Sequence, residues 1–119
     1  MSTGPADAAD PPLILRTHVE GDATIVQCSG KLTAGLTSIL REEVKRLIPQ
    51  STKIVLDLTL LTQMDSMGLG TIVGLYVSAK SSGCTLILIN LSQRVRELFR
   101  ITNVSSLLEV YGENIIRMP

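Results

Sequence analysis

The amino-acid sequence has few of the residues on which many binding and catalytic sites depend. It contains no tryptophan, its aromatic residues amount to 3%, and it has one histidine. So few aromatic rings argue against the stacking platforms that bind single-stranded nucleic acid. The single histidine, His18, excludes metal sites built from several histidines, and no spacing supports its pairing with a serine nucleophile. We therefore expect neither a metal site nor a catalytic residue.

The sequence also lacks an excess of charge of one sign, and it lacks long hydrophobic runs. Lysine and arginine together number 11, as do aspartate and glutamate, so no broad positive field attracts a phosphate backbone. The longest apolar runs, such as Leu86 to Ile89, are far short of the roughly 20 residues that span a bilayer. The first twelve residues hold no apolar stretch of the length of a signal peptide. The sequence predicts a cytoplasmic protein whose partner is another protein, not nucleic acid or a membrane.

The length and the cysteine content fit one intracellular domain. A chain of 119 residues fits a single domain, and Met1 to Pro12 are too small and polar to bury a core, so we expect a flexible tail followed by one domain over 13–119. Cys28 and Cys84 lie in apolar runs, where free cysteine behaves as a buried hydrophobe. A disulfide is the less favoured alternative because nothing marks secretion.

Hydrophobic periodicity predicts an α/β fold. Alternating or continuous apolar runs predict strands over residues 13–19, 23–28, 53–58 and 84–89. Apolar residues recurring at intervals of three and four predict helices over residues 36–48, 66–82 and 92–100. The order is ββαβαβα, followed by a helical segment at 107–111 and an ambiguous terminus at 114–118. Such alternation implies a mainly parallel sheet with functional loops at the carboxyl ends of its strands.

Local signals place the helix ends and the loops. Thr33 and Ser92 are candidate caps of the first and third helices, and Pro49 stops the first. Residues 59–65 are expected to form a loop after the strand at 53–58. Asp57 ends that strand, either as a hydrogen-bonded loop anchor or as a partner contact. Charged residues on the outer face of the first helix are interpreted as a solvated face: Arg41, Glu42, Lys45 and Arg46.

The most informative stretch is Asp65-Ser66-Met67-Gly68-Leu69-Gly70, which follows a buried strand and opens a helix. A serine there exposes its hydroxyl beside unpaired amides and the positive end of the helix dipole, where an added phosphate finds donors. Each glycine in a first turn lowers helix stability by about 1 kcal/mol relative to alanine. Such a cost suggests that another group approaches the start of this helix closely. The alternative stays open that Ser66 or Asp65 merely caps the helix, with the glycines allowing tight packing on the sheet.

Cofactor-binding motifs fit the same stretch less well. After Gly68 and Gly70 the next glycine is Gly74, one position too late for a dinucleotide fingerprint, and no P-loop lysine follows. We therefore expect no cofactor.

The motif and its surroundings resemble the STAS domain of anti-sigma factor antagonists. The resemblance rests on the strand Ile54 to Leu58, the spacing to Asp65-Ser66 and the Gly68-Leu69-Gly70 that follows. It extends over about Leu13 to Tyr111, including Gly30-Lys31-Leu32-Thr33 and the segment from Arg94 to Phe99. The chain departs from the family at Met67, usually a small polar residue, and at Lys31, commonly an acidic one.

This resemblance implies a STAS fold and a switch in bacterial transcription regulation rather than an enzyme. In such partner switching the unphosphorylated chain binds an anti-sigma factor that is also a serine kinase, which frees a sigma factor. Phosphorylation at Ser66 blocks that binding, and a phosphatase reverses it. The chain is expected to be a monomer or weak homodimer, and its partner-binding residues are Thr33, Asp65, Ser66, Met67, Gly68 and Leu69.

Two other roles within the same fold remain open. The chain is alternatively a STAS scaffold subunit of a large sensory complex, or a STAS accessory protein associated with a transporter. An enzyme or small-molecule binder is disfavoured because the sequence offers no acid/base pair, metal set or cofactor loop.

Overall fold

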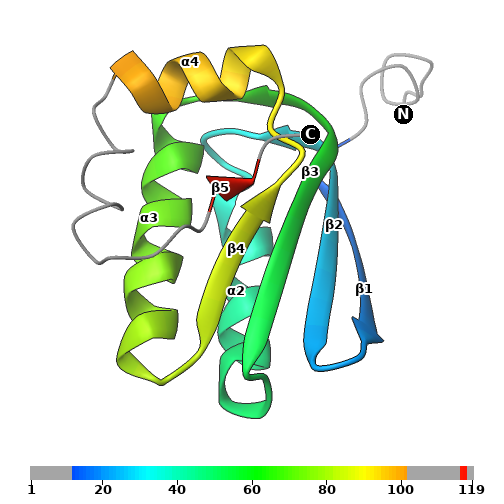
Figure 1. The fold of residues 1–119 in the computed structure, drawn as a ribbon. Coiled ribbons are helices and arrows are strands. Elements are labelled where there is room, and N and C mark those ends of the chain that lie inside the picture. The colour runs from blue at the N-terminus through cyan, green and yellow to red at the C-terminus, as the bar shows by residue number, and fades with distance from the viewer. Residues whose placement is uncertain (1–11, 102–115, 118–119) are drawn as a thin grey trace.

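The computed structural model describes residues 12–101 and 116–117 and contains a five-stranded sheet in the order β1-β2-β3-β4-β5 (Figure 1). The strands are β1 (Ile14–Glu20), β2 (Ala23–Leu32), β3 (Lys53–Met64), β4 (Thr85–Ile89) and β5 (Ile116–Arg117). β1 pairs antiparallel with β2, and every other pairing is parallel. The predicted hairpin and the mainly parallel sheet are confirmed.

Three α-helices accompany the sheet. They are α2 (Thr37–Leu47), α3 (Ser66–Ser81) and α4 (Gln93–Ile101), and a short 3-10 turn, η1 (Ile48–Gln50), follows α2. In Figure 1, α2 and α3 lie beside each other against one face of the sheet, and α4 crosses the end at which β4 finishes. The parallel strands β2 and β3 both end towards the start of α3, which places that helix terminus at the carboxyl edge of the sheet.

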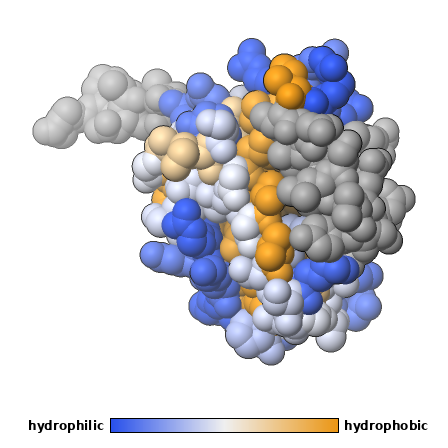
Figure 2. Space-filling model, turned by 90° about the vertical axis from the view of Figure 1, so that its left-hand side faces the viewer, coloured by the Kyte–Doolittle hydropathy of each residue, from blue (hydrophilic) through white to orange (hydrophobic). Residues whose placement is uncertain are grey.

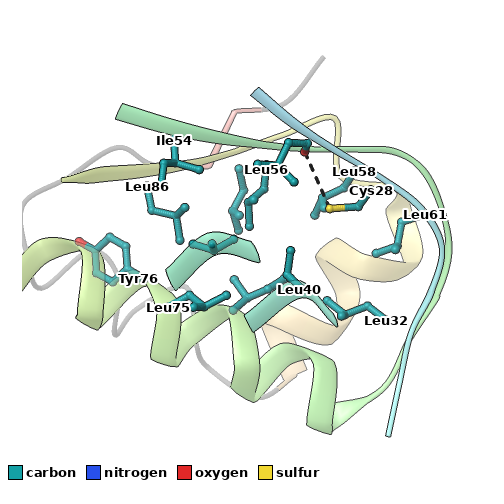
Figure 3. Packing of buried hydrophobic residues seen from close by; sticks show 14 of the residues in the cluster. Cys28, Leu32, Leu40, Ile54, Leu56, Leu58, Leu61, Leu75, Tyr76 and Leu86 are labelled. Atoms are coloured by element: carbon teal, nitrogen blue, oxygen red, sulfur yellow. Dashed lines mark hydrogen bonds between the residues drawn. The ribbon is translucent and has the colours of Figure 1, made fainter. Parts of the chain in front are cut away.

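The core lies between the sheet and the pair α2 and α3 (Figure 3). Alternate residues of β3 and β4 point into it, and the pairs Ile54 with Leu86 and Leu56 with Leu88 lie in register. Leu40 of α2 meets them from the helical side. Each fully buried aliphatic side chain of this kind stabilises the fold by about 1.5–3 kcal/mol. The prediction that 53–58 and 84–89 form buried strands is confirmed.

β3 is longer than the sequence indicated. Residues 59–64 were expected to form a loop, but they continue β3 as far as Met64 by pairing with the second half of β2. Two register shifts interrupt that pairing, and the Thr62 hydroxyl donates to the Gly30 carbonyl at 2.9 Å. The polar residues of this segment resemble a loop locally, whereas its strand conformation depends on a partner strand some 30 residues away in the chain.

Thr33 does not cap the first helix, so that expectation was wrong. α2 begins at Thr37, its N-cap position is Leu36, and no side chain caps it. The Thr33 carbonyl instead accepts a hydrogen bond from the Leu36 amide at 2.9 Å in a turn that precedes the helix. The prediction for Ser92 is confirmed, since its Oγ accepts from the Val95 amide at 3.2 Å.

Some details of the predicted helices change, and some lie outside the described residues. Ile39 and Val77, expected on apolar faces, are 38% and 43% exposed. Both cysteines are buried and free, so they form no disulfide. The expected tail before Pro12 and the expected helix at 107–111 lie outside the described residues.

Membrane-spanning helices and metal-binding clusters are both missing from the described part of the chain. Within residues 12–101 and 116–117 no helix has the length and apolar character needed to cross a membrane. Over the same ranges, His, Cys, Asp and Glu side chains form no group of three placed to hold a metal ion.

Candidate functional site

The site forms where β3 ends and α3 begins, and Asp65 determines how the helix starts. Asp65 has an extended backbone conformation, and its Oδ1 accepts a hydrogen bond from the Gly68 amide at 3.0 Å. This is the N-cap geometry in which a side chain takes up one of the amides left unpaired by the first turn. Of the two candidates, Asp65 is the cap.

The second carboxylate oxygen of Asp65 holds a different segment. Its Oδ2 accepts a hydrogen bond from the Ala34 amide at 2.9 Å, and the Asp65 amide donates to the Leu32 carbonyl at 3.4 Å. The hydrogen bonds from the Ala34 and Gly68 amides lower the pKa of Asp65 below its ordinary value of 3.8. Asp65 is therefore charged at neutral pH and joins the loop between β2 and α2 to the first turn of α3.

Ser66 is the first residue of α3, and its side chain is exposed. Its hydroxyl makes no hydrogen bond to any described residue, because Asp65 already serves as the cap. The neighbouring Met67 is 59% exposed. The site thus presents a serine hydroxyl that the fold does not use, beside a flexible apolar side chain on the surface.

The two glycines of the motif differ in what surrounds them. A Cβ on Gly68 would lie 2.1 Å from the Leu32 carbonyl oxygen, so only glycine allows α3 to approach β2 this closely. A Cβ on Gly70 would meet nothing within 4 Å. The packing explanation therefore holds for Gly68 and leaves Gly70 without a structural reason inside the domain.

Of the other two residues expected to bind a partner, one lies at the site and one does not. Leu69 is 3% exposed and belongs to the hydrophobic core, so its side chain is not on the candidate surface. Thr33 is half-buried and lies between Leu32 and Ala34, both of which hydrogen-bond to Asp65. The structure thus brings Thr33 to the site through the loop that Asp65 holds.

Asp57 forms a separate polar cluster. Its Oδ1 accepts hydrogen bonds from the Thr59 amide at 3.0 Å, the Thr59 hydroxyl at 2.6 Å and the Asn90 side-chain amide at 3.1 Å. Burial raises the pKa of Asp57, but the hydrogen bonds from Thr59 and Asn90 outweigh it, and the net pKa is lowered. These contacts are those of a structural anchor joining β3 to the end of β4.

The sequence analysis did not connect two exposed residues of α2 with Ser66. Arg41 and Lys45 are exposed, as expected of a solvated face, but they also line a cavity together with Ser66. Their spacing of four residues indicates a common helix face but not what that face meets. His18 lies elsewhere, on β1 at the edge of the sheet, where its Nε2 is 3.3 Å from the Glu20 carboxylate.

Comparison with known proteins identifies relatives of this arrangement. The chain is 33% identical over 89 residues to the anti-sigma-B factor antagonist of Bacillus subtilis (strain 168), an alignment that covers 75% of this chain and 82% of that protein.

Solved structures of low sequence identity share the fold. An anti-sigma factor antagonist from Mycobacterium paratuberculosis superposes with a TM-score of 0.72 at 14% identity, over 80% of this chain and 81% of that one. The Bacillus protein SpoIIAA, an anti-sigma factor antagonist, superposes in its unphosphorylated form with a TM-score of 0.68 at 21% identity, over 90% and 87% of the two chains. In its phosphorylated form the TM-score is 0.65 at 20% identity, over 90% of each chain.

The STAS domain family itself matches residues 15–114, which include nearly all of β1, the whole of β2, β3 and β4, and the Asp65-Ser66 turn. The predicted resemblance is confirmed, and this chain belongs to the STAS domain family.

Proposed function

We propose that this chain is a cytoplasmic anti-sigma factor antagonist, a regulatory binding protein whose docking to an anti-sigma factor is switched off by phosphorylation at Ser66. The relatives named as anti-sigma factor antagonists support the class of protein. One observation supports Ser66 as the acceptor: its hydroxyl is exposed and takes no part in capping α3, because Asp65 fills that role. A serine that the fold does not need is available for modification.

The phosphorylation step transfers one phosphoryl group from ATP bound to the anti-sigma factor kinase. The Ser66 oxygen forms a bond to the γ-phosphorus as the bond from that phosphorus to the ADP oxygen breaks, and the hydroxyl proton passes to a base of the kinase. The products are phosphoserine and ADP. A phosphatase restores the hydroxyl by hydrolysis, which releases inorganic phosphate.

The added charge explains loss of binding without a change of fold. Phosphate contributes a charge of about −1.5 to −2 at neutral pH, directly beside the ionised Asp65. Inside an interface with a partner, this group faces like charge and the cost of losing its hydration. A penalty of about 3 kcal/mol weakens binding more than a hundredfold.

The test compares Ser66→Ala and Ser66→Asp with the wild type for affinity to an anti-sigma factor kinase, measured by calorimetry. We expect alanine to retain wild-type affinity and to accept no phosphate from ATP, as followed by intact-protein mass spectrometry. Aspartate should weaken binding at least about tenfold. Ser81→Asp, at the opposite end of α3 and roughly 22 Å away, adds the same charge and serves as the matched control.

The outcome that contradicts the proposal is equally specific. If the wild type binds the kinase but gains no phosphate, and all three variants bind with equal affinity, Ser66 is not the switch. Unfolding curves recorded on each variant separate a binding effect from loss of the fold.

A further inference from the structure

The cavity beside Ser66 lies between α2 and α3 and has a volume of about 330 Å³. Arg41 and Lys45 line it from α2, and Ser66, Gly70 and Gly74 line it from α3. Because a water molecule takes up about 30 Å³, the cavity has room for a phosphate group and several waters. The Ser66 side chain therefore opens onto a space that is shared with two cationic side chains.

Both cations lack an anionic partner in the part of the chain that the structure describes. Arg46 on the same helix pairs with Glu43 at 2.9 Å, and Lys53 lies 3.9 Å from Asp22. Arg41 and Lys45 form no such pair with a described carboxylate, although both are exposed long side chains able to reorient. Two unpaired positive charges on one side of a cavity attract an anion to it.

Gly70 and Gly74 keep this space open. Both are exposed, and a Cβ on either would meet nothing within 4 Å. Glycine inside a helix lowers helix stability by about 1 kcal/mol relative to alanine. The two glycines therefore weaken α3, and no close packing contact compensates for this. Their effect is to remove side chains from the wall of the cavity between Ser66 and α2.

The surface on the side of α3 is mixed in polarity. Figure 2 views the side on which α3 lies, and there hydrophilic surface adjoins a pale area and a band of hydrophobic surface. The cavity wall is mixed in the same way, because Thr71 and Ser78 as well as the apolar Met67 and Leu75 line it beside the two cations.

We infer that the phosphate of phosphorylated Ser66 is bound within the chain itself, in the cavity between α2 and α3, by the side chains of Arg41 and Lys45. This inference rests on the proposed function, in which Ser66 is the phosphate acceptor. Arginine donates two parallel hydrogen bonds to phosphate oxygens, and lysine adds a compact charge. The two cations offset the repulsion between the phosphate and Asp65, so the phosphorylated chain stays folded while its phosphate remains at the site.

The experiment places phosphoserine at position 66 of the full chain by genetic encoding, so that no kinase or partner is needed. Phosphorus-31 NMR then follows the second ionisation of the phosphate, which has a pKa of about 6 when it is unperturbed. Nearby cations favour the dianion and lower that pKa. Arg41→Gln and Lys45→Gln should each raise it by about 0.5 unit or more, and the double variant should raise it further.

The matched control is Arg46→Gln, which removes the same charge from the same helix. Arg46 lines a different cavity with Leu15 and pairs with Glu43, so the phosphate pKa should stay at the wild-type value. Asp65 and the start of α3 are unchanged in every variant, so their effects on the phosphate cancel. Equal pKa values in all four variants, or an equal shift with Arg46→Gln, overturn the inference.

A second measurement identifies the other possible occupant, an acidic side chain of the partner. If Arg41→Gln and Lys45→Gln weaken binding of the unphosphorylated chain to the anti-sigma factor and leave the phosphate pKa unchanged, the cavity belongs to the partner and the inference fails. The NMR result does not depend on any kinase. It therefore fails or succeeds separately from the proposal that Ser66 is phosphorylated by the anti-sigma factor.

Discussion

Asp65 accepts a hydrogen bond from the backbone amide of Ala34, 31 residues earlier in the chain, at a distance of 2.9 Å. The same carboxylate caps α3 through the Gly68 amide. One side chain therefore sets both the helix that carries Ser66 and the loop that carries Thr33. Any partner that recognises this edge of the sheet meets two segments held in place by a single anion.

Replacing Asp65 should destabilise the fold and loosen the loop together. Loss of an N-cap alone costs about 0.5–2 kcal/mol, and Asp65→Ala also leaves the Ala34 amide without its acceptor. We expect a loss of about 1–2 kcal/mol in the free energy of unfolding measured with urea. Asp65→Asn keeps one acceptor oxygen and should fall between alanine and the wild type. Equal stability of Asp65→Ala and the wild type would show that neither hydrogen bond contributes.

The two glycines of the motif should respond in opposite directions to the same substitution. In Gly68→Ala the new methyl would lie 2.1 Å from the Leu32 carbonyl oxygen, so α3 must shift, at a cost of about 1–3 kcal/mol. Gly70→Ala meets open space and should gain up to about 1 kcal/mol from helix propensity. Thermal unfolding of both variants checks this, and a destabilised Gly70→Ala would mean that the open space is needed by the fold itself.

Stability should decrease in acid because Asp57 and Asp65 ionise more readily in the folded chain than in the unfolded one. Both pKa values are lowered from the ordinary 3.8, so the folded chain binds fewer protons as the pH falls through that value. Their contribution is complete above about pH 4 and is lost as the pH falls through the lowered values. Urea midpoints at about pH 7 and about pH 3 measure this loss, which should be smaller in Asp65→Asn. A midpoint in that variant that falls as steeply as in the wild type would exclude Asp65 as a source.

The two cysteines should be unreactive in the folded protein. Burial, together with the negative charge of Asp57, raises the pKa of the Cys28 thiol to about 12, and burial raises the pKa of Cys84 as well. Since the thiolate is the reactive form, a disulfide-exchange reagent at about pH 8 should modify neither residue until the chain unfolds. Both thiols should then react. Rapid labelling of the native protein would show that the sheet opens locally around Cys28.

Some features of the fold could be predicted from local sequence alone. The order of strands and helices from β1 to α4, the buried strands around Leu56 and Leu88, and the cap at Ser92 were predicted correctly, whereas strand β5 was not predicted. Each depends on side-chain periodicity or on a hydrogen bond between residues three positions apart. Such features are encoded within one turn or one strand of the chain, so the sequence shows them directly.

The sequence by itself determined the α/β order and the position of Ser66 at the start of a helix. Only the tertiary structure decided that β3 extends to Met64, that Asp65 is the cap and holds Ala34, and that Arg41 and Lys45 line a cavity with the serine. These relationships join segments far apart in the chain, whose proximity arises when hydrophobic burial brings the helices onto the sheet. Local sequence alone does not show which distant segment a helix face or a polar stretch will contact.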